Sequence, residues 1–263
     1  MIKVEKVHNG NRQRVIDCLS RNIIANVFAF YDLQHEPENT TMYAALDDMS
    51  LEGYVLIYTA LEFPSVVLEC PYKMAGRLID YTPEKSFIMH AQPNLLPIVK
   101  RKFPTAKIYV EKWMLVRRGQ ANFFDSRCVR RLNSKKDAEK LATLLSDKED
   151  RPVTPLKKYT KMIRKQSTYG IFIDHKLISY ASSFIQLPKI WMIGGVYTYP
   201  THRNKGYATL ATSAVTKKSL ENAEAAALFV RTDNHPAVKA YEKIGYKRIA
   251  DRLWIDVGVG MKP

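Results

Sequence analysis

The sequence predicts a mixed α/β fold of the α+β type, organised as two similar units in tandem. Its 263 residues suffice for two domains of ordinary size, and 46% hydrophobic with 25% charged residues is typical of a packed globular protein. The predicted elements follow a similar order in both halves, which suggests a duplicated unit although no residue-level repeat is visible. We therefore expect domains at residues 1–122 and 123–263, with the boundary in the polar segment 117–127.

The first half opens with an apolar pattern of helical period, followed by short runs rich in β-branched and aromatic residues. A long strand pattern closes it. In order, the predicted elements are helix 11–28, strands 41–46, 54–59 and 66–69, helix 72–81, strand 86–90, helix 94–102 and strand 107–116.

The second half repeats this alternation, and Ser134 is a suitable N-cap for its first helix. A segment that contains Pro152 and Pro155 separates that helix from the next. The predicted elements are strand 128–132, helices 135–145 and 156–164, strands 169–174, 177–185 and 190–198, helix 206–222, strand 226–231, helix 236–244, and strands 246–249 and 253–257.

The net charge of +15 indicates an anionic partner without saying which one. Nucleic acid, an acidic substrate and a polyphosphate cofactor all fit, and scattered solubilising lysines are the simplest explanation. The aromatic residues do not alternate regularly with the basic ones, so nucleic acid is the less favoured partner.

Composition also excludes several classes of protein. No apolar run approaches the roughly 18–20 residues that span a bilayer, and the first residues lack the apolar core of a signal peptide, so we expect a cytoplasmic protein without a membrane partner. Cys18, Cys70 and Cys128 are far apart and odd in number. They therefore predict neither a disulfide framework nor a metal site.

The most informative segment is residues 194–209, in which a β-type run turns abruptly into a helix. It reads Gly-Gly-Val-Tyr-Thr-Tyr-Pro-Thr-His-Arg-Asn-Lys-Gly-Tyr-Ala-Thr. Gly206 and Ala208 let a ligand approach the backbone, where the N–H groups of the first helical turn have no partner. These groups and the helix dipole suit a pyrophosphate, to which Arg203 and Lys205 would add positive charge.

A second motif follows at residues 233–246, Asp-Asn-His-Pro-Ala-Val-Lys-Ala-Tyr-Glu-Lys-Ile-Gly-Tyr. Asn234 is a suitable N-cap for a short helix, and Gly245 is a typical residue for its end. The helix carries one tyrosine, Tyr241.

Taken together, the two motifs resemble those of the GNAT superfamily of CoA-dependent N-acyltransferases, over about residues 168–250. The extra N-terminal half and the amino-acid sequence of residues 196–208 are most similar to the glycine N-acyltransferase-like branch, in which a degenerate domain precedes a functional one. In the first half, residues 69–76 lack the Arg-x-x-Gly-x-Ala pattern of residues 203–208, so we do not expect that half to bind CoA in the usual way. The matching positions are Pro200, Arg203, Gly206, Ala208, Asn234, Ala237, Tyr241, Gly245 and Tyr246.

The resemblance implies an N-acetyltransferase that moves an acetyl or other acyl group from acetyl-CoA to a primary amine by direct attack in a ternary complex, without a metal. It also implies that the strand around Gly195 parts from its neighbour and that Tyr241 protonates the departing CoA thiolate; a phenol with a pKa of about 10 holds its proton at neutral pH. The positions implied to contact CoA are Val196, Tyr197, Thr198, Arg203, Asn204, Lys205, Gly206, Tyr207, Ala208, Thr209, Asn234 and Tyr241.

The base that deprotonates the acceptor stays open, because residues 190–199 contain no Asp, Glu or His. A water relay, His202, His235 or an already neutral amine could serve. Large aromatic residues such as Trp191 and Trp254 could line an acceptor cleft, but at strand positions they are more often core.

Several readings of function and partners follow. The acceptor is a small-molecule or peptide amine, and the chain is a monomer or a homodimer. One alternative is a catalytically inactive CoA-binding regulatory module, which the missing strand carboxylate supports. Another is a nucleic-acid-associated acyltransferase that uses the basic surface.

Overall fold

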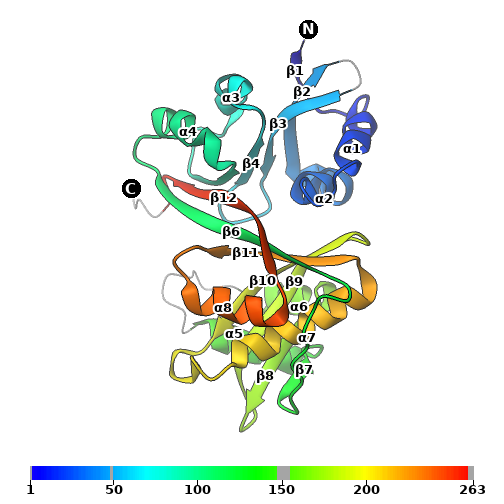
Figure 1. Cartoon of the computed structure of the whole chain (residues 1–263), viewed down its shortest axis with the longest axis vertical. Coiled ribbons are helices and arrows are strands. Elements are labelled where there is room, and N and C mark those ends of the chain that lie inside the picture. The colour runs from blue at the N-terminus through cyan, green and yellow to red at the C-terminus, as the bar shows by residue number, and fades with distance from the viewer. Residues whose placement is uncertain (1, 48–49, 147–154, 260–263) are drawn as a thin grey trace. The chain divides into compact units, whose positions relative to one another are not determined.

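The computed structural model describes residues 2–47, 50–146 and 155–259 (Figure 1). It divides into a first unit, Met1–Lys112 with Ala250–Pro263, and a second unit, Trp113–Ile249. This division differs from the expected boundary at residues 122 and 123. Strand β6 (Lys107–Arg117) starts in the first unit and continues into the second, and the end of β12 (Lys247–Val257) pairs with a strand of the first unit. A single boundary along the chain cannot show that the C-terminal residues from Ala250 on belong to the first unit.

The first unit contains a mixed sheet in the order β1-β2-β3-β4-β5-β12. Strands β1 to β4 are antiparallel neighbours, β4 and β5 are parallel, and β12 is antiparallel to β5. The elements are β1 (Lys3–Lys6), α1 (Arg12–Ser20), α2 (Val27–His35), β2 (Thr40–Asp47), β3 (Ser50–Tyr58), β4 (Ser65–Glu69), α3 (Tyr72–Leu78), β5 (Phe87–Ala91) and α4 (Leu96–Lys102), with short 3₁₀ turns at Pro37–Asn39, Ile79–Tyr81 and Pro93–Leu95.

The predicted helix 11–28 is in fact divided between α1 and α2. Between them, the Asn22 side chain accepts a hydrogen bond from the Ala25 amide at 3.2 Å, and the Asn26 side chain donates to the Asn22 carbonyl at 3.1 Å. Such local side-chain bonds offer the backbone an alternative to the helix.

Helices cover both faces of this first sheet. Ala44 and Leu56 pack with the apolar residues of α1 and α2, whereas their chain neighbours Ala45 and Val55 pack with those of α3 and α4. Successive residues of a strand point to opposite faces, so both residues of each pair are buried. This is a layered α/β arrangement with two apolar clusters.

The second unit has a sheet in the order β6-β11-β10-β9-β8-β7, in which β10 and β11 are parallel and β7 to β10 are antiparallel neighbours. Helices α7 and α8 pack in one apolar cluster, and α5 and α6 in another. The elements are β7 (Val129–Arg131), α5 (Lys135–Ser146), α6 (Leu156–Lys165), β8 (Thr168–Ile173), β9 (Lys176–Gln186), β10 (Ile190–Thr198), α7 (Tyr207–Asn222), β11 (Ala225–Arg231) and α8 (His235–Ile244), with a 3₁₀ turn at Pro200–His202.

The mixed α/β class is confirmed, and most predicted elements are present. The predicted N-cap of α5 forms, since the Ser134 hydroxyl accepts from the Asp137 amide at 3.1 Å. The expected strands 246–249 and 253–257 are one continuous strand, β12, which polar Asp251 and Arg252 do not interrupt. In the part of the chain that the structure describes, no helix combines the length and apolarity needed to cross a bilayer.

Candidate active site

Strands β10 and β11 separate at their carboxyl ends. Their parallel pairing runs from Ile190↔Ala225 to Met192↔Ala227, and no later pair joins them among the described residues, although β10 continues to Thr198. Beyond Met192 the edge of β10 that faces β11 therefore lacks a strand partner. Openings at the carboxyl ends of neighbouring parallel strands are where α/β sheets bind ligands.

A β-bulge accompanies this separation on the other edge of β10. The register with β9 shifts between Gly194 and Tyr197, and Gly195 has φ +65°. A Cβ atom on Gly195 would lie 3.0 Å from the hydroxyl oxygen of Tyr180. Both the backbone conformation and the close approach therefore require glycine. Sequence reasoning missed Tyr180, because a tyrosine within a β-type run carries no signal of its own.

The N-terminus of α7 is open for an anion. Gly206 is the N-cap with φ +81°, no side chain caps the helix, and its first turn contains no acidic residue. A Cβ atom at Gly206 would meet no atom within 4 Å. Within the described ranges, no backbone or side-chain acceptor bonds the amides of Tyr207, Ala208 and Thr209. These amides and the helix dipole fit a diphosphate.

Polar residues precede this helix on an exposed turn. Arg203, Asn204 and Lys205 are exposed, and Asn204 has φ +63°. The Arg203 Nε donates to the Thr198 carbonyl at 3.2 Å, and its guanidinium carbon lies 5.9 Å from the centre of the Tyr197 ring. Arg203 is thus anchored on the end of β10 while its side chain remains exposed.

Thr198 and Tyr197 are held to β9. The Ser179 hydroxyl donates to the Tyr197 carbonyl at 3.0 Å and shares a 2.8 Å hydrogen bond with the Thr198 hydroxyl. Val196 packs against the same apolar cluster as α7 and α8. The carboxyl end of β10 is therefore supported on its β9 side and free on its β11 side.

Tyr241 is a buried residue of α8 with 6% of its surface exposed. Burial raises the pKa of its hydroxyl to about 12, so the group keeps its proton at neutral pH. Among the described residues, its hydroxyl has no hydrogen-bond partner. Its ring packs in the cluster that Val196 and Tyr207 also contact, which brings it together with β10 and α7.

The predicted caps of α8 are present. The Asn234 side chain accepts from the Ala237 amide at 3.2 Å, and Gly245 ends the helix with φ +104°. Asn234 itself is exposed, so the capping bond leaves its amide nitrogen accessible.

The remaining sequence candidates lie in different environments. His202 is half-buried and shares a 3.0 Å hydrogen bond with Thr201, whereas His235 is exposed at the first turn of α8. Trp191 is buried in β10. Trp254 belongs to the first unit, where its ring meets His90 edge-on at 4.9 Å. Across the described residues, no group of His, Cys, Asp and Glu side chains has the arrangement of a metal site.

The equivalent place in the first unit is closed. There the parallel pairing of β4 and β5 continues to Leu68↔Ala91, and the Gln92 side chain donates to the carboxylate of Glu69 just beyond it. The strands therefore stay joined where β10 and β11 separate. This difference agrees with the expectation that the first half is degenerate.

A cavity of about 420 Å³ in the second unit lies elsewhere. It is lined by residues that include Phe124, Tyr169 and Lys217, and none of the predicted coenzyme A positions contributes to it. The strand separation and the open helix N-terminus, rather than this cavity, mark the candidate active site.

Comparison with solved structures identifies the class of fold as tandem GNAT. A Drosophila protein superposes with a TM-score of 0.75 at 12% identity, covering 98% of this chain and 99% of that chain. A tandem GNAT protein from the clavulanic acid biosynthesis pathway superposes with a TM-score of 0.62 at 14% identity, covering 97% of this chain and 99% of that chain. A GCN5-related N-acetyltransferase from Sphaerobacter thermophilus superposes with a TM-score of 0.64 at 11% sequence identity. The superposition covers 100% of this chain and 98% of that chain.

The match to a protein-family model covers a smaller part of the chain. Residues 168–255 match the model of FR47-like protein, and this range includes the strand opening, α7 and Tyr241. No curated protein matches the chain. The resemblance to the GNAT superfamily and the tandem mixed-sheet fold are therefore confirmed, and the glycine N-acyltransferase-like branch stays a prediction.

Proposed function

We propose that the protein is a CoA-dependent N-acetyltransferase that transfers an acetyl or other acyl group from acetyl-CoA to a primary amine, by direct attack in a ternary complex. One observation carries the proposal: β10 leaves β11 after Met192, beside an α7 whose first amides have no acceptor among the described residues. The GNAT-like fold supports acyl transfer in general.

The residues at the site fit coenzyme A. Residues 203–209 and the amides of α7 would hold its diphosphate, and the free edge of Val196, Tyr197 and Thr198 would hold the pantetheine arm and the acyl carbonyl. Asn234, exposed at the start of α8, would contact the same molecule. When bound, acetyl-CoA supplies the activated acyl group as a thioester.

Tyr241 would act as the proton donor. Its raised pKa keeps the phenol protonated, and its hydroxyl is not already used in a hydrogen bond to another described residue. It can therefore donate its proton to the sulfur that leaves as the amine attacks. We propose no specific base for the amine, since β10 carries no carboxylate or histidine.

The proposal is tested with the purified full chain, acetyl-CoA and a panel of small amines, amino acids and lysine-containing peptides. Thiol release and the mass of the acylated product are measured. We expect release that depends on an amine. Tight CoA binding without thiol release on any amine would contradict the enzymatic proposal and favour a regulatory CoA-binding module.

A charge reversal tests the location of the coenzyme. Lys205→Glu places a carboxylate before the open end of α7 and should weaken CoA binding by at least about tenfold. Lys161→Glu on α6 makes the same change in charge at an exposed position of the same unit. Equal CoA affinity of the two variants would show that the diphosphate binds elsewhere.

The partners and location are part of the same proposal. We propose a cytoplasmic protein, monomeric or homodimeric, that acts on a small-molecule or peptide amine. If its basic surface serves nucleic acid instead, binding to RNA or DNA should be measurable at low salt and fall steeply as salt rises.

A further inference from the structure

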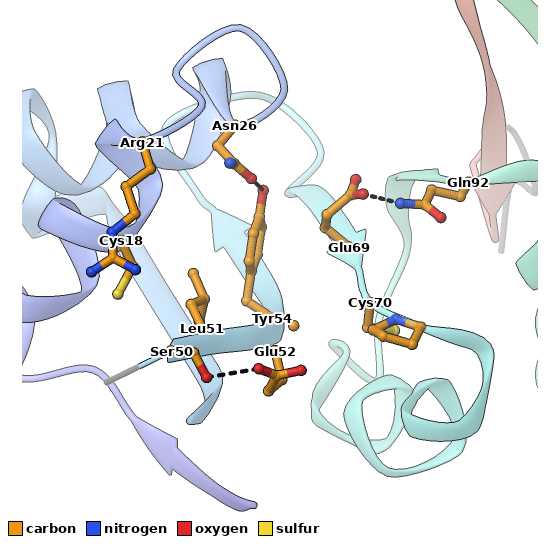
Figure 2. A pocket seen from close by; sticks show the side chains of 12 residues that line it. Cys18, Arg21, Asn26, Ser50, Leu51, Glu52, Tyr54, Glu69, Cys70 and Gln92 are labelled. Atoms are coloured by element: carbon orange, nitrogen blue, oxygen red, sulfur yellow. Dashed lines mark hydrogen bonds between the residues drawn. The ribbon is translucent and has the colours of Figure 1, made fainter. Parts of the chain in front are cut away.

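A second cavity, of about 420 Å³, lies within the first unit, and none of the residues placed in the coenzyme A site lines it (Figure 2). It is bounded by α1, β3 and the end of β4, and its volume falls in the range of about 300–1,000 Å³ that is typical of small-molecule sites. The lining residues that matter below are Arg21, Asn26, Glu52, Gly53, Tyr54 and Glu69.

The wall of this cavity is held in place. Tyr54 and Glu69 are directly opposite each other in the β3–β4 pair. The Tyr54 ring is buried, and its hydroxyl donates to Asn26 Oδ1 at 3.0 Å. A Cβ atom at Gly53 would lie 2.5 Å from Cys70 Cβ, so no larger residue fits between the strands there. The cavity therefore has a rigid aromatic and backbone wall rather than a mobile one.

One of its carboxylates is already neutralised. Arg252 Nη1 donates to Glu69 Oε2 at 2.5 Å, and Gln92 donates to the other oxygen. The Arg252 and Glu69 side chains are only 12% and 20% exposed. This pair supplies polarity without net charge, so it does not decide the sign of a ligand.

Two other charged residues of the lining have no ion-pair partner among the described residues. Glu52 accepts a 2.7 Å hydrogen bond from the Ser50 hydroxyl, but no cationic group among the described residues pairs with it. Arg21 likewise has no ion-pair or side-chain hydrogen-bond partner in the described part of the chain. Figure 2 shows Arg21 on one side of Tyr54 and Glu69 on the other, with Glu52 below Tyr54 in this view. With respect to the described residues, the cavity thus presents one free anion, Glu52, and one free cation, Arg21.

We propose that this cavity binds a small zwitterion, a free α-amino acid, with its ammonium group on Glu52 and its carboxylate on Arg21. A simple amine would leave Arg21 uncompensated, and a simple carboxylate would leave Glu52 uncompensated. A ligand with both charges satisfies both groups with charge-assisted hydrogen bonds. The site lies in the unit without the strand opening, so it is a binding site additional to the proposed active site.

The test uses the full chain and a panel of free amino acids, from glycine to glutamine and leucine, at millimolar concentration. Binding is measured by thermal shift and by calorimetry. We expect at least one of them to bind and raise the melting temperature. Its N-acetyl derivative, which lacks the ammonium group, and its amide, which lacks the carboxylate, should each bind at least about tenfold more weakly.

Variants locate the site. Arg21→Gln and Glu52→Gln should each weaken binding of the same amino acid at least about tenfold, whereas Lys161→Glu, at an exposed position of α6 in the second unit, should leave it unchanged. The proposal is overturned if no amino acid binds, if both derivatives bind as well as the parent, or if both first-unit variants retain full affinity. The derivatives probe the unmodified chain, so the result does not depend on whether a variant folds.

Discussion

Tyr241 and Tyr246 offer a paired test of catalysis against stability. Both are buried in the same apolar cluster, with ring centres 6.1 Å apart. The Tyr246 hydroxyl forms a 2.8 Å hydrogen bond with Thr216, whereas no described residue bonds the Tyr241 hydroxyl. Replacing each tyrosine by phenylalanine removes one hydroxyl oxygen. Among the described residues, only the loss at Tyr246 breaks a hydrogen bond.

The magnitudes follow from these contacts. Tyr246→Phe should cost about 1 kcal/mol of unfolding free energy, because Thr216 keeps its 2.7 Å bond to the Thr212 carbonyl. That loss lowers the melting temperature of a unit of this size by about 2–4 °C. Tyr241→Phe loses no hydrogen bond to a described residue and should change stability by less than about 0.5 kcal/mol. Its turnover should fall by about 10²–10⁴, the usual contribution of a positioned proton donor.

The assay combines thermal or denaturant unfolding with amine-dependent thiol release and CoA binding, for the wild type and both variants. Tyr241→Phe should retain CoA affinity and stability while losing turnover, and Tyr246→Phe should retain turnover well below its melting temperature. Wild-type turnover in Tyr241→Phe would remove this phenol from the mechanism. Equal losses of turnover in both variants would indicate a structural role for the pair.

Further predictions concern the bulge, a helix cap and a buried acid. In unfolding experiments, Gly195→Ala should lower stability by about 1–2 kcal/mol, because Gly195 has φ +65° and a Cβ atom there would crowd Tyr180; turnover should also fall. Gly76→Ala is the control. A Cβ atom at Gly76 meets no atom within 4 Å, so this variant should be neutral or stabilising in the same experiments. Asn234→Ala should cost about 1 kcal/mol in the same measurement through the lost cap of α8. Burial raises the pKa of Asp32 to about 7, so stability should fall as pH rises from about 4 to 7, and Asp32→Asn should flatten this dependence of the melting temperature.

Each of these predictions has an outcome that contradicts it. Equal stabilities of the two glycine variants would mean that the bulge tolerates a side chain. An unchanged melting temperature for Asn234→Ala would make its cap dispensable. For Asp32 the sign is set by a folded-state pKa above the unfolded value, since the folded state then binds more protons between them. A melting temperature that rises over that pH range in the wild type, but not in Asp32→Asn, would contradict this assignment.

The strand and helix pattern was largely readable from the sequence, because buried strands and amphipathic helices differ in period. Helix 11–28 was the clearest exception. Its apolar spacing continues through residues 21–26, where the structure has a turn and the side chains of Asn22 and Asn26 bond to the backbone. The two strands predicted between residues 246 and 257 failed for the opposite reason, since pairing within a sheet carried β12 through a polar dipeptide.

By itself, the sequence determined the turn that precedes α7 and the start of that helix. Gly206, the basic residues before it, and the Asn234 and Gly245 caps act over a few neighbouring residues, so their spacing along the chain is enough to reveal them. The tertiary structure alone decided where β10 leaves β11, which tyrosine hydroxyl is left without a partner among the described residues, and that the final strand completes the first unit. Those features depend on contacts between residues far apart in the chain, and a local pattern does not encode which distant strand will be the neighbour.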